Sequence, residues 1–199
     1  PSGEVVQVSR ASETLTVADL KRRGKPIQRN ASASIWDAGD EVLLVEYHSK
    51  MNAMDPLSME ILLTAVDMAE YGDWKGILIA NDSNNFCAGA NLGLALFGAN
   101  LAAWKDVEDF IALGQEAYQA LKYTEVPVVA ASTGVGVGGG AEVLLHCDAV
   151  QAHSESYVGL VEVGVGIVPG WGGCKEMLAR LSAFGIAPNG PMGAVMKAF

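Results

Sequence analysis

Two glutamates adjoin stretches of the chain that have almost no side chains. Glu142 directly follows the glycine-rich run 134–141, and Glu162 lies further on in a second glycine-rich segment, 159–170. Glycine lets a ligand approach main-chain N–H groups closely. Two neighbouring carboxyl groups can divide the removal and the delivery of a proton between them. These residue types therefore indicate acid–base chemistry on a ligand that is held by backbone amides.

The same glycine run also satisfies a dinucleotide-binding pattern. Gly134, Gly136 and Gly139 have the G-x-G-x-x-G spacing, and Glu155 lies near the distance expected of a ribose-binding acid. Three features weaken this interpretation. The helix predicted after the run is short, more than one strand–helix element precedes it, and the glycines continue beyond what the pattern needs. A P-loop is favoured even less, because no Gly-Lys-Ser/Thr follows.

In the other interpretation, the glycine turn is part of an oxyanion site. Main-chain N–H groups at such a turn, backed by a helix N-terminus, stabilise negative charge that develops on a carbonyl oxygen. A second donor must then come from elsewhere in the chain. The candidate is segment 85–92, a turn of small residues that follows a predicted strand.

The elements that must position these residues alternate from residue 41 onwards. Asp55 and Pro56 are typical of a helix start and Gly72 of its end. Apolar runs predict strands at 42–47, 76–80, 126–131 and 149–153, and periodicity predicts helices at 56–71, 103–122 and 141–147. Strands that alternate with helices indicate an α/β fold.

Four motifs along the chain resemble those of the enoyl-CoA hydratase/isomerase (crotonase) family, in the same order. They are segments 86–92, 126–131, 138–142 and 166–173, and segment 49–54 is similar to the family's early CoA-binding segment. The resemblance covers about residues 35–181 and implies a crotonase-like spiral of repeated ββα units. The two end segments resemble the hydratase part of long bacterial 3-hydroxyacyl-CoA dehydrogenase/enoyl-CoA hydratase proteins.

The resemblance also implies roles for individual residues. The N–H groups of Ala90 and Gly139 would hold the thioester oxygen of the substrate. Glu142 would activate water and Glu162 would deliver a proton to the α-carbon, with the roles reversed in dehydration. The further substrate-binding residues would be Lys50, Asn52, Ala88, Asn91, Leu92 and Gly138, where Asn91 departs from the aspartate common at its position.

The implied activity is hydration of a trans-2-enoyl-CoA thioester in fatty-acid β-oxidation, as part of a bifunctional 3-hydroxyacyl-CoA dehydrogenase. Both acids are present, which favours a hydratase over an isomerase, since an isomerase needs only one carboxylate. Isomerisation or another crotonase-type reaction, and a non-catalytic acyl-CoA-binding region, stay open. CoA belongs to the substrate, so no cofactor is expected here, and NAD is expected only for a linked dehydrogenase domain.

Composition limits the partners and the compartment. A net charge of −10 argues against nucleic acid or an anionic membrane as the main partner. No signal peptide or bilayer-length apolar run is present, so a cytoplasmic protein is expected. The three cysteines predict buried thiols in a reducing compartment. They and the three histidines have no metal-ligand spacing, so no metal site is expected, and His146 is predicted to be a packed structural residue.

The chain is predicted to have two parts. Residues 1–34 are expected to be a linker or the edge of a preceding domain, with a short helix from Thr16 to Gly24 and a polar linker at 30–34. Residues 35–199 are expected to be a truncated hydratase core without the C-terminal helices of the family. The first residue is Pro1 rather than methionine, which indicates a piece excised from a longer polypeptide. Homo-oligomerisation is possible for such a core.

Overall fold

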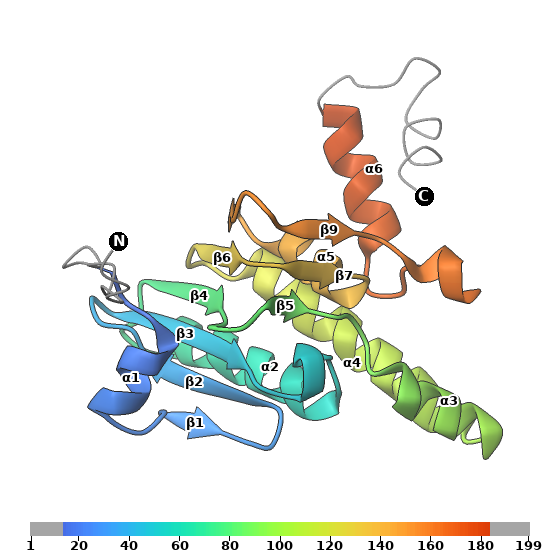
Figure 1. Ribbon diagram of the computed structural model, residues 1–199, viewed down its shortest axis with the longest axis horizontal. Coiled ribbons are helices and arrows are strands. Elements are labelled where there is room, and N and C mark those ends of the chain that lie inside the picture. Colours follow the sequence, from blue (N-terminus) through green and yellow to red (C-terminus); the bar gives the residue numbers. More distant parts are fainter. Residues whose placement is uncertain (1–13, 184–199) are drawn as a thin grey trace, which may run out of the picture.

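A computed structural model describes residues 14–183 and confirms the α/β fold (Figure 1). Six strands form the larger sheet, in the order β1-β2-β3-β4-β6-β8. They are β1 (Gln28–Arg29), β2 (Ala33–Asp37), β3 (Val42–Tyr47), β4 (Gly76–Ala80), β6 (Val128–Ser132) and β8 (Ala149–Ala152). Strand β2 pairs antiparallel with both β1 and β3, whereas β3, β4, β6 and β8 pair in parallel.

A second, smaller sheet gives the chain a repeated path. It contains the parallel strands β5 (Asn85–Cys87), β7 (Val135–Val137) and β9 (Tyr157–Gly159). Strands β4, β6 and β8 each continue into a strand of this sheet and then into a helix. These helices are α4 (Trp104–Tyr123), α5 (Gly139–His146) and α6 (Gly173–Ala183). In the first repeat a further helix, α3 (Leu92–Asn100), comes before α4. The backbone thus repeats a ββα unit, as expected.

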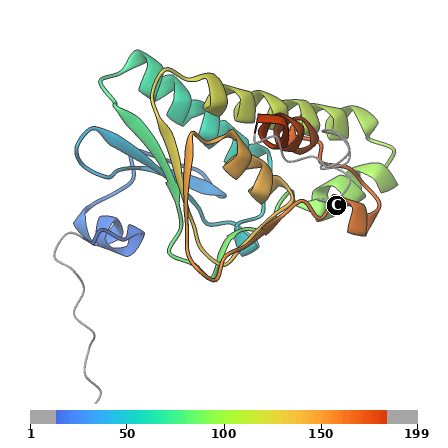
Figure 2. The ribbon, with the colours of Figure 1, turned by 90° about the horizontal axis from the view of Figure 1, so that it is seen from above.

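Helices cover both faces of the larger sheet. On one face α2 (Pro56–Tyr71) packs with α4 over the main hydrophobic core, and on the other lies α1 (Val17–Arg23) (Figure 2). The caps confirm the predicted ends of both α1 and α2. Asp55 accepts a hydrogen bond from the Ser58 amide at the start of α2, and Gly72 is its C-cap.

Three predictions from the sequence are wrong in detail. The polar linker at 30–34 is instead the turn into β2, where Asn30 Oδ1 accepts from the amides of Ser32 and Ala33. The boundary expected at residue 34 therefore falls inside a strand of the sheet. The helix expected from residue 141 begins at Gly139, which places its N-terminus in the glycine turn. Cys174 is exposed, whereas Cys87 and Cys147 are buried as predicted.

Several elements had no clear sequence signal. Strands β5, β7 and β9 have three residues each, too few for a hydrophobic period to show.

No helix between residues 14 and 183 is both long and apolar enough to cross a membrane. Within the same residues, no cluster of three or more His, Cys, Asp or Glu side chains is arranged to hold a metal ion.

Candidate active site

Two backbone N–H groups lie side by side where β5 and β7 end. A Cβ placed on Gly139 would be 3.4 Å from the Ala90 nitrogen, and one placed on Gly89 would be 3.2 Å from the Gly139 nitrogen. Within the described residues, neither the Ala90 nor the Gly139 N–H donates to a protein acceptor. Gly139 opens helix α5, so its amide also lies at the positive end of the helix dipole. This pair of free donors can hold an oxyanion.

Hydrogen bonds on either side keep the two amides in place. The Met54 amide donates to Gly89 O at 2.8 Å and the Asn91 amide to Met54 O at 2.7 Å, so the bonds to Met54 flank Ala90 without using its N–H. The Tyr118 hydroxyl, fully buried on α4, donates to Gly139 O at 2.7 Å. Protein contacts alone therefore hold the backbone around both amides.

Glu142 lies one turn into α5 and is 2% exposed. Its Oε1 accepts hydrogen bonds from the Trp171 amide at 2.9 Å and the Gly173 amide at 2.8 Å. Burial raises the pKa of Glu142 to about 7; the charge of Glu162 adds to this, and the two amides act in the opposite direction. A carboxyl group with a pKa near neutrality can both take up and release protons.

Glu162 approaches the same turn from the η2 helix (Glu162–Val165) and is 7% exposed. A Cβ placed on Gly138 would lie 3.1 Å from Glu162 Oε1, so the carboxylate packs against the turn that carries the Gly139 amide. The other oxygen, Oε2, is buried and has no hydrogen-bond partner among the described residues. Buried polar atoms are normally satisfied, and a bound water or ligand would satisfy this one.

The structure brings the predicted catalytic residues together: Ala90, Gly139, Glu142 and Glu162 surround one turn. Of the predicted substrate-binding residues, Gly138 lies in this turn, whereas Ala88, Asn91 and Leu92 adjoin Ala90 along the chain. The Ala88 amide donates a hydrogen bond to Met51 O at 3.2 Å. The Leu92 side chain, at the start of α3, is 45% exposed.

The other two predicted substrate-binding residues lie in the η1 turn (Lys50–Asn52), beside Ala88. Lys50 is exposed to solvent. The Asn52 side chain is buried and donates to Ser83 Oγ and Asn85 O, both at 2.8 Å, so it holds the turn before β5. The side-chain NH₂ group of Asn52 therefore already donates its hydrogen bonds within the protein.

The dinucleotide interpretation does not fit this geometry. Gly136 lies within β7, and Gly134 precedes that strand, so the glycines do not form one turn between a strand and a helix. Glu155 is exposed on the turn between β8 and β9. The free amide at Gly139 belongs instead to a site with two acids.

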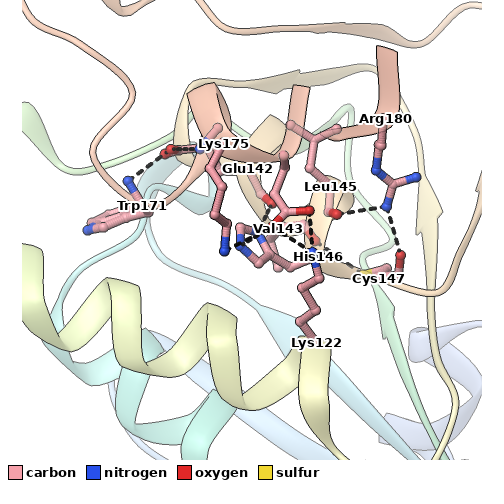
Figure 3. Close-up of polar contacts among 11 residues, drawn as sticks. Lys122, Glu142, Val143, Leu145, His146, Cys147, Trp171, Lys175 and Arg180 are labelled. Carbon is pink, nitrogen blue, oxygen red and sulfur yellow. Dashed lines mark hydrogen bonds and ion pairs between the residues drawn. The ribbon is translucent and has the colours of Figure 1, made fainter. Parts of the chain in front are cut away.

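Residues remote in the sequence complete the site. His146 is packed, as predicted; its Nδ1–H donates to Glu142 O at 2.7 Å, and burial lowers its pKa (Figure 3). The Trp171 ring packs edge-on against Phe110 and Tyr118, with centroids 5.3 and 5.5 Å apart, and a Cβ on Gly139 would lie 2.4 Å from it. Tyr118 and the Gly173 amide had no sequence signal, because their roles depend on contacts between distant segments.

Comparisons with known proteins agree with this geometry. Residues 38–188 match the profile of the family described as enoyl-CoA hydratase/isomerase. A Bacillus subtilis (strain 168) protein named "Probable 3-hydroxyacyl-CoA dehydrogenase" is 38% identical over 99% of this chain, which spans 24% of its length. A "Crotonyl-CoA hydratase" of Syntrophomonas wolfei is 35% identical over 74% of the chain and 57% of its own length.

A solved structure shows the same fold. The enoyl-CoA hydratase from Thermoplasma volcanium GSS1 superposes with a TM-score of 0.69 at 25% identity, covering 85% of this chain and 64% of that one. The predicted crotonase-like spiral is thereby confirmed.

Proposed function

The chain belongs to the enoyl-CoA hydratase/isomerase family, and we propose that it is a hydratase module that adds water to a trans-2-enoyl-CoA thioester in fatty-acid β-oxidation. One observation carries the proposal: the free N–H groups of Ala90 and Gly139 lie beside two buried carboxylates, Glu142 and Glu162. Amides so placed suit a thioester oxygen, and the acids suit the proton transfers of hydration.

The amide pair would act on the charge that develops during addition. Water attacks the β-carbon of the conjugated thioester, and the electrons of the double bond move onto the thioester oxygen as an enolate. The N–H groups of Ala90 and Gly139 donate to that oxygen. Because Tyr118 and Met54 already hold the surrounding backbone, the dipoles need no reorganisation when the charge appears.

The two glutamates would move the protons. Glu142 takes a proton from water as its oxygen bonds to the β-carbon, and Glu162 gives its proton to the α-carbon as the enolate collapses. One carboxyl gains a proton and the other loses one, so the total on the pair is unchanged. A pKa of about 7, to which the nearby charge of Glu162 contributes, suits Glu142 as a base near neutral pH.

The remaining substrate contacts follow from the placement of the predicted residues. The exposed Lys50 would meet a CoA phosphate as a point charge. Ala88, Asn91, Leu92 and Gly138 adjoin the amide pair and would contact the thioester end of the substrate. Asn52 would support binding through the turn that it holds rather than by direct contact.

The wider assignment is also part of this proposal. The similarity to a relative named as a 3-hydroxyacyl-CoA dehydrogenase supports a covalently linked dehydrogenase domain. We place the NAD site in that domain and no cofactor in this chain. We further propose residues 35–199 as most of the hydratase core, and residues 1–34 as the segment that connects it to a preceding domain and adds α1, β1 and the start of β2 to it. A homo-oligomeric assembly and a cytoplasmic location are also part of the proposal.

Steady-state hydration of crotonyl-CoA by the whole protein tests the proposal. Glu142→Gln and Glu162→Gln should each lower kcat by about 10²-fold or more, because each removes a group that transfers a proton. Glu116→Gln, an exposed position on α4, is the matched control and should leave kcat unchanged. Undiminished turnover in both active-site variants contradicts the mechanism. Conversion of a 3-enoyl-CoA without hydration would favour the isomerase, and tight binding without turnover the non-catalytic alternative.

A further inference from the structure

A buried ion cluster lies behind the active site, between α4, α5 and α6. Glu176, on α6, is 2% exposed. Its two oxygens accept from Lys122 Nζ at 2.7 and 2.5 Å, Lys175 Nζ lies 3.0 Å away, and His146 Nε2 lies 3.8 Å away. Figure 3 shows Lys122 reaching into the cluster from α4 and Lys175 from α6. A buried carboxylate is tolerated only where such partners compensate for its lost hydration.

Glu176 is connected to the segment that holds Glu142. The backbone amide of Glu176 donates to Gly172 O at 2.9 Å, and this hydrogen bond forms the first turn of α6. Gly172 lies between Trp171 and Gly173 in the chain. Those two flanking amides are the donors to Glu142 Oε1. Any shift of the start of α6 therefore moves the hydrogen bonds on Glu142.

His146 packs against Gly172, in the segment that leads into α6. A Cβ placed on Gly172 would lie 2.9 Å from His146 Cε1, so the imidazole packs directly against this residue. The Nδ1–H group of the same imidazole donates a hydrogen bond to the backbone oxygen of Glu142. The cluster thus contacts both the backbone of Glu142 and the loop that binds its carboxylate.

One face of α4 contacts three parts of the site. Gly114, Tyr118 and Lys122 follow one another at intervals of four residues, which places them on one side of the helix. A Cβ on Gly114 would lie 2.2 Å from the Trp171 indole nitrogen, so the ring rests on this glycine. Tyr118 holds Gly139 O, and Lys122 holds Glu176. Lys122 therefore connects α4 directly to the first turn of α6.

We propose that Lys122 and Glu176 are a positioning pair, which fixes the start of α6 so that the amides of Trp171 and Gly173 stay on Glu142. Neither residue is among the predicted catalytic or substrate-binding residues. The kinetic consequence rests on the proposed hydratase function, whereas the effect on the 171–173 backbone does not.

The test compares two charge-neutral double variants of the whole protein. Lys122→Met/Glu176→Gln removes the positioning pair without leaving an isolated buried charge. Lys105→Met/Asp109→Asn removes the exposed ion pair between residues 105 and 109 of the same helix and is the matched control. We expect the first to lower kcat by about 10- to 100-fold with KM changed less than about threefold, because a displaced general base loses alignment. The control should retain wild-type kcat.

Hydrogen–deuterium exchange gives a readout that does not need catalysis. In Lys122→Met/Glu176→Gln, the peptide that spans residues 170–175 should exchange about tenfold faster or more, while peptides from the larger sheet keep wild-type rates. Lys122→Arg, which retains the positive charge, should keep kcat within about threefold of wild type.

The outcomes separate the two proposals. If the wild-type protein does not hydrate enoyl-CoA, the proposed function fails and exchange alone decides the positioning role. Unchanged exchange at 170–175 overturns the positioning pair, as does a wild-type kcat in the double variant of an active protein. A uniform rise in exchange across the sheet, or a kcat loss in Lys122→Arg equal to that of the double variant, also overturns it.

Discussion

Replacing Glu142 by glutamine should stabilise the protein in mildly alkaline solution while it removes activity. The carboxyl is 2% exposed, and its pKa is raised to about 7 from 4.5, chiefly by burial. Between these two values the folded state keeps a proton that the unfolded chain has released. The free energy of unfolding therefore falls as pH rises through this window, since the folded state binds more protons than the unfolded state.

The size of the effect follows from the shift. A difference of about 2.5 pKa units corresponds to at most about 3 kcal/mol of stability that is present at pH 4 and lost by pH 8. The Glu142→Gln variant cannot ionise, yet its side-chain oxygen can still accept from the amides of Trp171 and Gly173. It should therefore gain up to about 3 kcal/mol over wild type at pH 8 relative to its difference at pH 4, and about 2.5 kcal/mol relative to its difference at pH 5.

Urea unfolding followed by tryptophan fluorescence at pH 5 and pH 8 measures this difference. Other titrating groups are shared by both proteins and cancel in the comparison. The exposed Glu116→Gln is the control and should show no such pH-dependent gain. A gap between Glu142→Gln and wild type that is the same at both pH values, within about 0.5 kcal/mol, would refute the argument that burial destabilises the Glu142 carboxylate.

Two further substitutions test the amide pair. Gly139→Ala would place a Cβ 2.4 Å from the Trp171 ring and displace the turn. We expect kcat to fall by about 10²- to 10³-fold, as on loss of one oxyanion donor, and steady-state kinetics would contradict this if kcat stayed within tenfold. Tyr118→Phe deletes the donor to the buried Gly139 O and should cost about 1–3 kcal/mol in urea unfolding. Tyr123→Phe, at an exposed tyrosine of the same helix, is the control.

The sequence by itself determined the α/β alternation and several element ends, because these depend on local chemistry. Asp55, Pro56 and Gly72 specify the ends of α2 through caps and backbone angles that involve only their neighbours. The local motifs also singled out the two glutamates. The linker expected at 30–34 was wrong, because polar residues occur in turns as well as in linkers. Here Asn30 accepts hydrogen bonds in the turn that joins β1 to β2, and those two strands pair with each other.

Only the tertiary structure decided which backbone groups can act on a ligand. Every residue except proline carries an N–H, so side-chain identity does not reveal that those of Ala90 and Gly139 are free and adjacent. The amides on Glu142 come from residues 29 and 31 positions away. The pKa of that carboxyl is set by its burial and the nearby Glu162. These properties arise from contacts between distant segments, and folding alone brings those segments together.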